Sequence, residues 1–284
     1  HRDLHLSLRR QRQMCIRDRS NVEVLLVTPQ MQSFDAGEKV RDKPHMKLEE
    51  IDAPNWDYDY DFWSESKVEL EGRTINFNRI IMPMNEDEEE MISWLKKMEL
   101  DAVVCSGSRR NVSIWEKWMS PTETLFRAAA KSGIPTLGIC FGHQLLCHSL
   151  GSKVERAEKF SSGIWNLELT KEGENDELLT NHTENIREIA TLFSHQDHVM
   201  SVPKNCTLLS RTSHNDITAI RVNDDLGNPL PAWGIQFHPE AARKRIERAY
   251  GWGHISEEEY KSFRGEHDGS GILSSFAKIV AEKV

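Results

Sequence analysis

A cysteine placed midway between two glycines is the residue of this sequence best suited to chemistry. Cys140 lies two residues after Gly138 and two residues before Gly142. Residues 135–139 are mostly apolar and predict a buried parallel strand, and residues 142–150 predict a helix that ends at a glycine. A strand that turns directly into a helix needs small flanking residues, as in the turns that carry serine nucleophiles. We therefore expect Cys140 on a strained, exposed turn at the carboxyl end of a strand, where open α/β sheets bind ligands.

The predicted position of Cys140 also favours its reactive form. A free thiol has a pKa of about 8.5, and the partial positive charge of a helix N-terminus stabilises the thiolate. A buried, inert cysteine is the alternative, and it is the commoner fate of a single cysteine in a cytosolic protein. The pattern around Cys140 alone leaves both interpretations open.

A histidine and a glutamate near the end of the chain supply the groups that a nucleophilic thiol requires. The stretch from Trp233 to Phe237 predicts a strand that leads into His238, and Pro239 fixes the backbone before Glu240. A thiol nucleophile needs a base to accept its proton, and the base needs a partner that orients it. His238 and Glu240 fit these two roles, although taken alone they also fit an ordinary turn at a strand end.

Further strands and loops must position these residues. Four apolar runs predict buried strands of a parallel sheet: 22–27, 101–105, 135–139 and 232–237. Gly107 follows the second of these runs, in a loop where a glycine lets the backbone approach a substrate. Residues 153–158 and 164–170 alternate apolar and polar side chains and predict two antiparallel strands. The sequence thus predicts an α/β protein.

Four motifs together resemble the class I, triad-type glutamine amidotransferases. They are, in chain order, DAVVCSGS ending at Ser108, GICFGHQLL around Cys140, Ser194-His195-Gln196-Asp197, and GIQFHPE around His238 and Glu240. The resemblance covers residues 21–245, and the combination is far more specific than any single motif. It implies a three-layer α/β fold with an open, mostly parallel sheet and helices on both faces, similar to flavodoxin, plus a small set of antiparallel strands.

The resemblance implies hydrolysis of the side-chain amide of glutamine through a thioester on Cys140. His238 would accept the thiol proton and deliver it to departing ammonia, while Glu240 would orient His238. Fixed donors to the negative oxygen of the intermediate matter, because losing one typically costs about 100- to 1000-fold in rate. The matching motifs imply five further site positions: Gly107 and Phe141 as backbone donors to that oxygen, and Gln144, Ser194 and His195 as contacts to the amino-acid end of glutamine.

Composition and charge narrow the range of functions. The chain has 284 residues, a net charge of −9, 38% hydrophobic residues and 29% charged residues. This balance argues against a general nucleic-acid surface, and no apolar run suits a membrane span or a signal peptide. Five scattered cysteines show neither a disulfide framework nor a zinc pattern, which favours reduced thiols in the cytoplasm. A metal site at His195 and His198 lacks further ligands, so neither a metal nor a cofactor is expected.

Three segments are predicted along the chain. Residues 1–20 are basic, unlike the rest, and are expected to be a disordered or non-native tail. Residues 21–245 are expected to form the glutamine amidotransferase-like domain, and residues 246–284 a C-terminal helical extension. Over residues 55–63 acids alternate with aromatic residues. That pattern fits a lid or docking face for a partner, and it also fits a surface segment that packs its rings inward.

Three functions remain open from the sequence. The leading interpretation is a glutaminase that supplies ammonia to a separate synthetase protein, because only 44 residues follow Glu240 and no phosphate-binding loop is visible. A γ-glutamyl hydrolase or peptidase with the same triad is the alternative. The third is a catalytically silent regulatory protein on the same fold, which is expected to lack one of the three triad residues.

Overall fold

The structure is a computed structural model of the chain. It describes residues 21–27, 74–79, 86–98, 100–105, 107–108, 110–117, 119–183, 185–186, 188–241, 243–251, 253 and 255–283. The predicted N-terminal tail over residues 1–20 and the acidic and aromatic segment over residues 55–63 lie outside these ranges.

The described strands form one eight-stranded sheet in the order β2-β1-β3-β4-β10-β9-β8-β6. The first five strands of that order run parallel: β2 (Thr74–Arg79), β1 (Asn21–Val27), β3 (Ala102–Cys105), β4 (Thr136–Ile139) and β10 (Pro229–Ile235). The last three pair antiparallel: β9 (Asn215–Asn223), β8 (Cys206–Thr212) and β6 (Glu168–Leu169). The short, fully buried parallel strands are the apolar runs that the sequence predicts.

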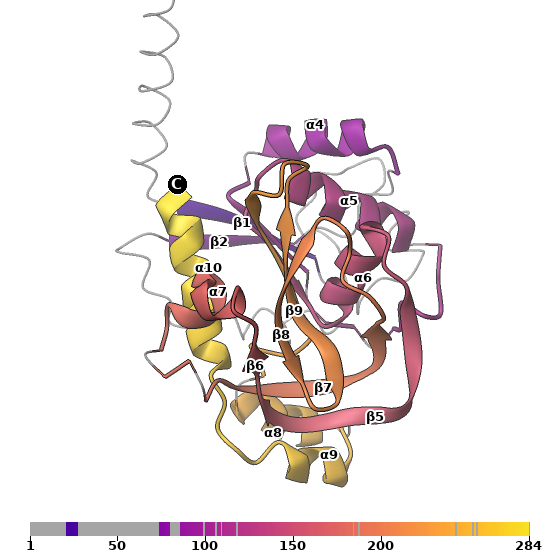
Figure 1. Cartoon of the computed structure of the whole chain (residues 1–284), viewed down its shortest axis with the longest axis vertical. Coiled ribbons are helices and arrows are strands. Elements are labelled where there is room, and N and C mark those ends of the chain that lie inside the picture. The colour runs from indigo at the N-terminus through magenta and orange to yellow at the C-terminus, as the bar shows by residue number, and fades with distance from the viewer. Residues whose placement is uncertain are drawn as a thin grey trace, which may run out of the picture.

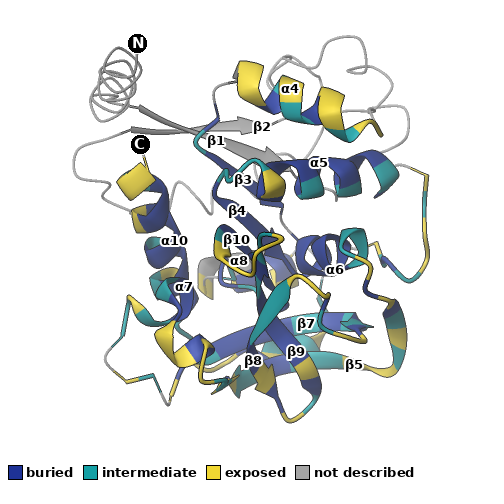
Figure 2. Cartoon of the chain, turned by 45° about the horizontal axis from the view of Figure 1, so that its top comes forward, coloured by how far each residue is buried: buried dark blue, intermediate teal, exposed yellow. Residues whose placement is uncertain are grey.

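Helices cover both faces of this sheet (Figures 1 and 2). One face packs against α4 (Glu88–Met98), α5 (Met119–Lys131) and α6 (Phe141–Ser149), and the other against α7 (Glu177–Thr180) and α10 (Gly269–Lys283). A hydrophobic core lies on each face: the first beneath α4, α5 and α6, and the second beneath α7 and α10. Strand β3 shows the division, because its Val103 and Cys105 belong to the first core and its Ala102 and Val104 to the second. Alternate residues of a strand point to opposite faces. The predicted three-layer, mostly parallel α/β fold is confirmed.

The C-terminal residues are helical and lie in part within the second hydrophobic core. After α8 (Arg243–Gly251) and α9 (Glu257–Ser262), helix α10 buries an apolar face that includes Ile272, Leu273 and Phe276. Figure 2 shows this inward face of α10 as buried and its far end as exposed. The predicted domain boundary at residue 245 stays a prediction.

A second, two-stranded antiparallel sheet lies across one end of the main sheet (Figure 1). It pairs β5 (Val154–Asn166) with β7 (Ala190–Val199). The expectation of antiparallel strands over residues 153–158 and 164–170 is confirmed, but their bounds were wrong: β5 runs without a break to Asn166, and β6 covers only Glu168–Leu169. The register shifts between Arg156 and Ser161, so an irregular polar stretch interrupts the alternation while the strand continues against its distant partner.

Candidate active site

Cys140 lies on a tight turn between β4 and α6. Its φ of 50° makes it a non-glycine residue with positive φ, a conformation that costs on the order of 1–3 kcal/mol. The backbone holds the turn on both sides, since the Cys140 amide donates to Ile235 O at 2.8 Å and its carbonyl accepts from the Gln144 amide at 3.0 Å. The structure therefore has the strained strand-to-helix turn that the sequence predicts.

The two flanking glycines are required by close backbone contacts. A Cβ on Gly138 would lie 2.6 Å from Gly142 O, and a Cβ on Gly142 would lie 2.5 Å from Cys105 O. Real Cβ atoms essentially never approach backbone so closely. Any side chain at either position would force β3, β4 and α6 apart.

The predicted exposure of Cys140 was wrong, because the residue is only 5% exposed. Strand β7 crosses next to the turn, and the Cys140 thiol donates to Ser194 O at a sulfur–oxygen distance of 4.0 Å. Contacts between residues so far apart in sequence leave no local pattern. The thiol is covered partly by polar groups, since the His238 side chain also hydrogen-bonds to it.

His238 and Glu240 follow β10, the strand next to β4 in the sheet. The His238 amide donates to Leu192 O at 2.7 Å, and its Nδ1 lies 2.7 Å from Glu240 Oε1. Their side chains are 16% and 3% exposed. Because Nδ1 contacts the carboxylate, Nε2 is the ring nitrogen available for proton exchange with Cys140.

The charge state of His238 is set by these partners. Burial opposes the protonated imidazole, but Glu240 and Cys140, through their charges and hydrogen bonds, outweigh burial and raise the pKa of His238 well above 6.5. The raised pKa favours a protonated imidazole at His238, beside the sulfur of Cys140. Such a pair can attack an electrophilic carbon and then return the proton to a leaving group.

The two backbone groups predicted to bind a negative oxygen lie on either side of Cys140. Phe141 begins helix α6 immediately after it. Gly107 is buried after β3, and a Cβ there would lie 2.7 Å from His238 Cε1 and 3.6 Å from Cys140 Cβ. Gly107 therefore lies close to both reacting side chains, with no room for a side chain of its own against His238. The roles of Gly107 and Phe141 as oxyanion donors stay predictions.

The three positions predicted to contact glutamine meet around β7. Ser194 O touches the thiol, and His195 Nδ1 lies 3.1 Å from Asp197 O. Gln144 is 3% exposed, and its Nε2 donates to Asp197 O at 3.0 Å and to Gln236 Oε1 at 3.1 Å. The amide nitrogen of Gln144 is thus engaged inside the protein. Contact of these residues with substrate stays a prediction.

Sequence reasoning did not assign a role to Asp197 or Ser113. The Asp197 carboxylate accepts from the Ser113 amide and from the Ser113 hydroxyl, each at 2.8 Å. Asp197 was part of a matching motif, which was the available signal. Nothing in the sequence around Ser113 indicates its partner, 84 residues away.

Three histidines gather near the site. The His195 ring lies 4.8 Å from that of His198 and 5.9 Å from that of His214, and burial lowers the pKa of each. Within the described part of the chain, no group of three or more His, Cys, Asp or Glu side chains is placed to hold a metal ion. The lowered pKa values favour neutral imidazoles, of which His195 is buried and His198 and His214 are half-buried.

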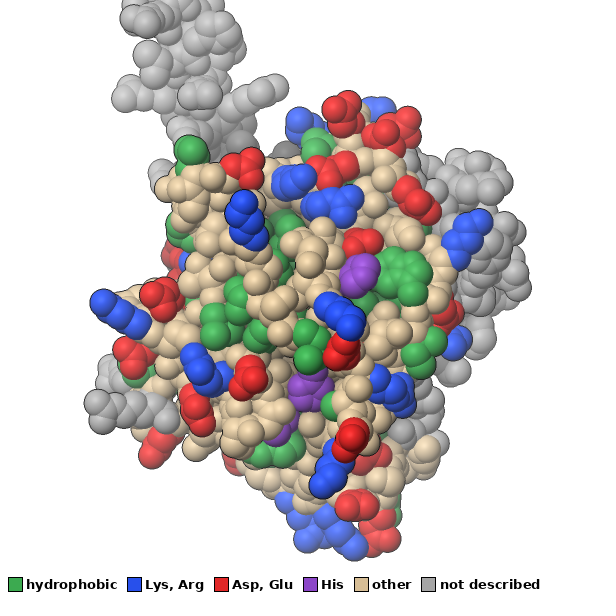
Figure 3. Space-filling model, turned by 45° about the vertical axis from the view of Figure 1, so that its right-hand side comes forward, with side chains coloured by type: hydrophobic (Ala, Val, Ile, Leu, Met, Phe, Trp, Pro, Cys, Tyr) green, Lys and Arg blue, Asp and Glu red, His purple; other side chains and the backbone are tan. Residues whose placement is uncertain are grey.

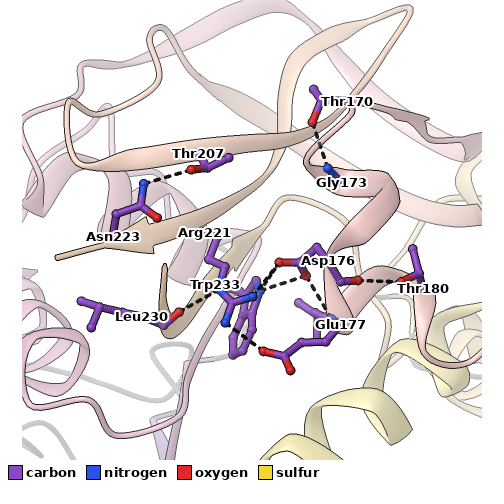
Figure 4. Close-up of polar contacts among 11 residues, drawn as sticks. Thr170, Gly173, Asp176, Glu177, Thr180, Thr207, Arg221, Asn223, Leu230 and Trp233 are labelled. Atoms are coloured by element: carbon purple, nitrogen blue, oxygen red, sulfur yellow. Dashed lines mark hydrogen bonds and ion pairs between the residues drawn. The ribbon is translucent and has the colours of Figure 1, made fainter. Parts of the chain in front are cut away.

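A buried polar network links β10 to β9 and α7 (Figure 4). The buried carboxylate of Asp176 accepts from Trp233 Nε1 at 3.1 Å and from Arg221 Nη1 at 3.1 Å. Arg221 also donates to Glu177 Oε1 at 2.8 Å and stacks 4.5 Å from the Trp233 ring centroid. Burial raises the pKa of Asp176 and the Arg221 charge opposes that rise. The network ties α7 to β9 and β10.

The surface intersperses charges of both signs. Figure 3 shows acidic and basic side chains side by side, with histidines and small hydrophobic areas between them. Among the described residues, no helix is both long and apolar enough to cross a membrane.

The site combines a thiol on a strand-to-helix turn with an imidazole–carboxylate pair beside it. On an open α/β sheet, these features indicate a protein with a candidate cysteine nucleophile. A family model of class-I glutamine amidotransferases matches residues 63–250. The chain belongs to this family. Membership implies hydrolysis of the amide of glutamine.

Two relatives show how much of a larger protein the chain spans. It is 32% identical over 190 residues to one of the subunits of GMP synthase (glutamine-hydrolyzing) from Pyrococcus abyssi. The matched region covers 66% of this chain and 80% of that relative. It is 33% identical over 168 residues to the GMP synthase of Thermus thermophilus. Here the matched region covers 57% of this chain but only 28% of the relative.

Solved structures share the fold. A glutamine amidotransferase from Thermotoga maritima has a TM-score of 0.56 at 17% identity, covering 92% of this chain and 98% of that one. The glutaminase domain of Trypanosoma brucei CTPS, with bound acivicin, has a TM-score of 0.55 at 12% identity, covering 90% and 94%. At such identities the likeness concerns the fold alone.

Proposed function

We propose that this chain hydrolyses the side-chain amide of glutamine with Cys140, His238 and Glu240 as its catalytic triad. The Cys140 thiolate attacks the amide carbon, and its former proton resides on His238. His238 then protonates the amide nitrogen, ammonia leaves, and a γ-glutamyl thioester remains on Cys140. Water, deprotonated by His238, attacks the thioester, which releases glutamate and regenerates the thiol.

The observation that carries this proposal is the state of His238. It hydrogen-bonds to Cys140, its Nδ1 lies 2.7 Å from Glu240 Oε1, and its pKa is raised well above 6.5. A raised pKa keeps the proton on the imidazole while the sulfur attacks. Glu240 is buried and holds the ring in one orientation, which supports its role as the orienting group.

The tetrahedral intermediate carries its negative oxygen next to Cys140. We assign the stabilising donors to the backbone N–H groups of Gly107 and Phe141, which flank the thiol on two neighbouring segments. Ser194, His195 and Gln144 are assigned to the side of the site that faces the amino-acid end of glutamine. Support comes from the position of Ser194 O beside the sulfur.

We further propose that the released ammonia is used by a separate synthetase protein. The similarity to a relative that is named as one of the subunits of GMP synthase supports an assembly in which another chain consumes the ammonia. Glutamine labelled with ¹⁵N in its amide tests this, because a synthetase partner in the mixture should incorporate the label more efficiently than it incorporates added ammonia.

The hydrolytic step is tested with glutamine and γ-glutamyl peptides assayed side by side for ammonia and amine release. Cys140→Ala should abolish turnover of glutamine, whereas Cys147→Ala, at a buried cysteine in the helix that follows, should retain it. A glutamine analogue with a thiol-alkylating group should modify Cys140. Release from peptides alone would favour a γ-glutamyl hydrolase, and modification at Cys147 alone would contradict the triad.

A further inference from the structure

We propose that Asp197 is a positioning residue that sets the spacing between the two backbone segments on either side of Cys140. The inference rests on the proposed glutamine hydrolysis and extends it to a residue outside the triad. Asp197 does not touch the reacting atoms in the structure. It acts through Ser113, which belongs to the segment between β3 and α5.

The contact between these residues is a two-point clamp. One carboxylate oxygen of Asp197 accepts from the Ser113 amide and the other from the Ser113 hydroxyl, both at 2.8 Å. Asp197 is 1% exposed. A buried carboxylate is costly unless it is hydrogen-bonded, so this geometry strongly favours one position of the segment.

The clamped segment begins at the active site. Gly107 lies against His238 and Cys140, and Ser113 follows six residues later. Between them the Arg110 amide donates to the Ser108 hydroxyl at 3.0 Å, which shortens the reach of the chain. The segment is thus held at the triad at one end and at Asp197 at the other.

The same residue also organises the opposite wall. The backbone carbonyl of Asp197 accepts from Gln144 Nε2 at 3.0 Å and lies 3.1 Å from His195 Nδ1. Three residues earlier in β7, Ser194 O lies 4.0 Å from the sulfur. Asp197 therefore joins β7, α6 and the segment after β3, each of which approaches Cys140.

Gly107 and Ser194 O both lie near the sulfur, and in the proposed function the substrate amide is bound between them. Releasing the clamp lets the segment from Gly107 to Ser113 move relative to β7, and displacements near 1 Å cost about 100-fold in catalysis. The Cys140–His238–Glu240 contacts do not pass through Asp197. Loss of the clamp should therefore impair use of glutamine more than the intrinsic reactivity of the thiol.

The experiment compares Asp197→Asn, Ser113→Ala and the double variant with wild type in steady-state glutaminase kinetics. We expect Asp197→Asn to lower kcat/KM by about 10- to 100-fold, largely through a higher KM. Ser113→Ala, which keeps the backbone donor, should lower it by about three- to tenfold. The double variant should be no worse than Asp197→Asn alone, because both changes weaken the same contact, Asp197→Asn by removing its charge and Ser113→Ala by removing its hydroxyl. Alkylation of Cys140 by iodoacetamide should stay within about twofold of wild type.

Two matched variants separate positioning from general stability. Asp176→Asn alters another buried carboxylate, in the network with Arg221 and Trp233, and Ser152→Ala removes a hydroxyl that donates to Ser201 O. Both should lower the melting temperature and leave the KM for glutamine unchanged. Equal losses of kcat/KM in these variants would overturn the inference, as would additive effects of Asp197→Asn and Ser113→Ala.

The outcomes also separate the inference from the function on which it rests. An active wild type with unchanged kinetics in Asp197→Asn overturns the role of Asp197 alone. A folded wild type that releases no ammonia from glutamine overturns the proposed function, and the inference with it. Should Asp197→Asn fail to fold, Ser113→Ala decides, since it deletes only a hydroxyl at a half-buried position; unchanged kinetics in that variant would count against the clamp.

Discussion

A methyl group added at Gly107 tests whether the imidazole occupies its working position in the structure. In Gly107→Ala the new Cβ would lie 2.7 Å from His238 Cε1, 3.4 Å from His238 Nδ1 and 3.6 Å from Cys140 Cβ. The substitution keeps the backbone N–H of residue 107. The variant therefore tests displacement of the ring without deleting the backbone N–H proposed as an oxyanion donor.

The size of the effect follows from the contact distances. Ordinary van der Waals contact begins at 3.4 Å, so the 2.7 Å contact must widen by at least 0.7 Å. The His238 ring cannot yield freely, because Glu240 Oε1 holds its Nδ1 at 2.7 Å and its surroundings are buried. A movement near 1 Å at a reacting group costs about 100-fold in rate. We expect kcat/KM for glutamine to fall by about 10- to 100-fold.

The assay is glutamine-dependent ammonia release at several pH values, with Gly251→Ala as the matched control. A Cβ at Gly251, at the exposed end of α8, has no neighbour within 4 Å, so this variant should match wild type. Both proteins should show the circular dichroism spectrum of wild type. If Gly107→Ala is folded and keeps kcat/KM within about threefold of wild type, the close approach of Gly107 to a catalytically placed His238 is refuted.

Three further predictions concern charge and backbone packing. Glu240→Gln removes the negative charge that supports the His238 cation, so the pKa of His238 in an NMR titration should fall and kcat/KM should drop by about 10²- to 10⁴-fold; an unchanged pKa would contradict this. Burial lowers the pKa of His143 from 6.5 to about 4, so the folded state binds fewer protons at this residue than the unfolded state does. The stability that His143 contributes above pH 6.5 should therefore be lost as the pH falls toward 4. The loss attributable to this residue is about 3 kcal/mol, and urea titrations should show a weaker pH dependence in His143→Gln than in wild type. Gly142→Ala would set a Cβ 2.5 Å from Cys105 O, so its urea midpoint should fall well below that of wild type, and a wild-type midpoint would show that the turn can open without cost.

The predictable part of the site consists of local sequence features. The glycines around Cys140 indicate the strand-to-helix turn because the backbones that exclude a Cβ belong to nearby segments. His238 and Glu240 are two residues apart, so their contact could be inferred from the Pro239 between them. Apolar runs likewise predicted the buried strands, since a parallel strand covered on both faces has a continuous hydrophobic sequence.

The parts that were missed depend on pairing between distant segments. The burial of Cys140 results from β7, whose Ser194 is 54 residues away, and the clamp joins Ser113 to Asp197 across 84 residues. The prediction ended strand β5 too early because its alternation fails between Arg156 and Ser161, where the register with β7 also shifts before pairing resumes. Such pairing is a property of the folded topology and leaves no periodic signal.

The sheet ladder explains how the thiol and the imidazole, about a hundred residues apart, come together. Strands β4 and β10 are parallel neighbours, with Ile139 opposite Ile235, so both chains leave the sheet at the same edge. The Cys140 amide then bonds to Ile235 O at 2.8 Å, which extends the ladder by one step into the turn. A shift of one residue in this register would move His238 along the strand by about 3.3 Å and turn its side chain to the other face. The meeting of Cys140 and His238 is therefore set by backbone pairing, and side-chain substitutions in the core that preserve the register should leave it intact.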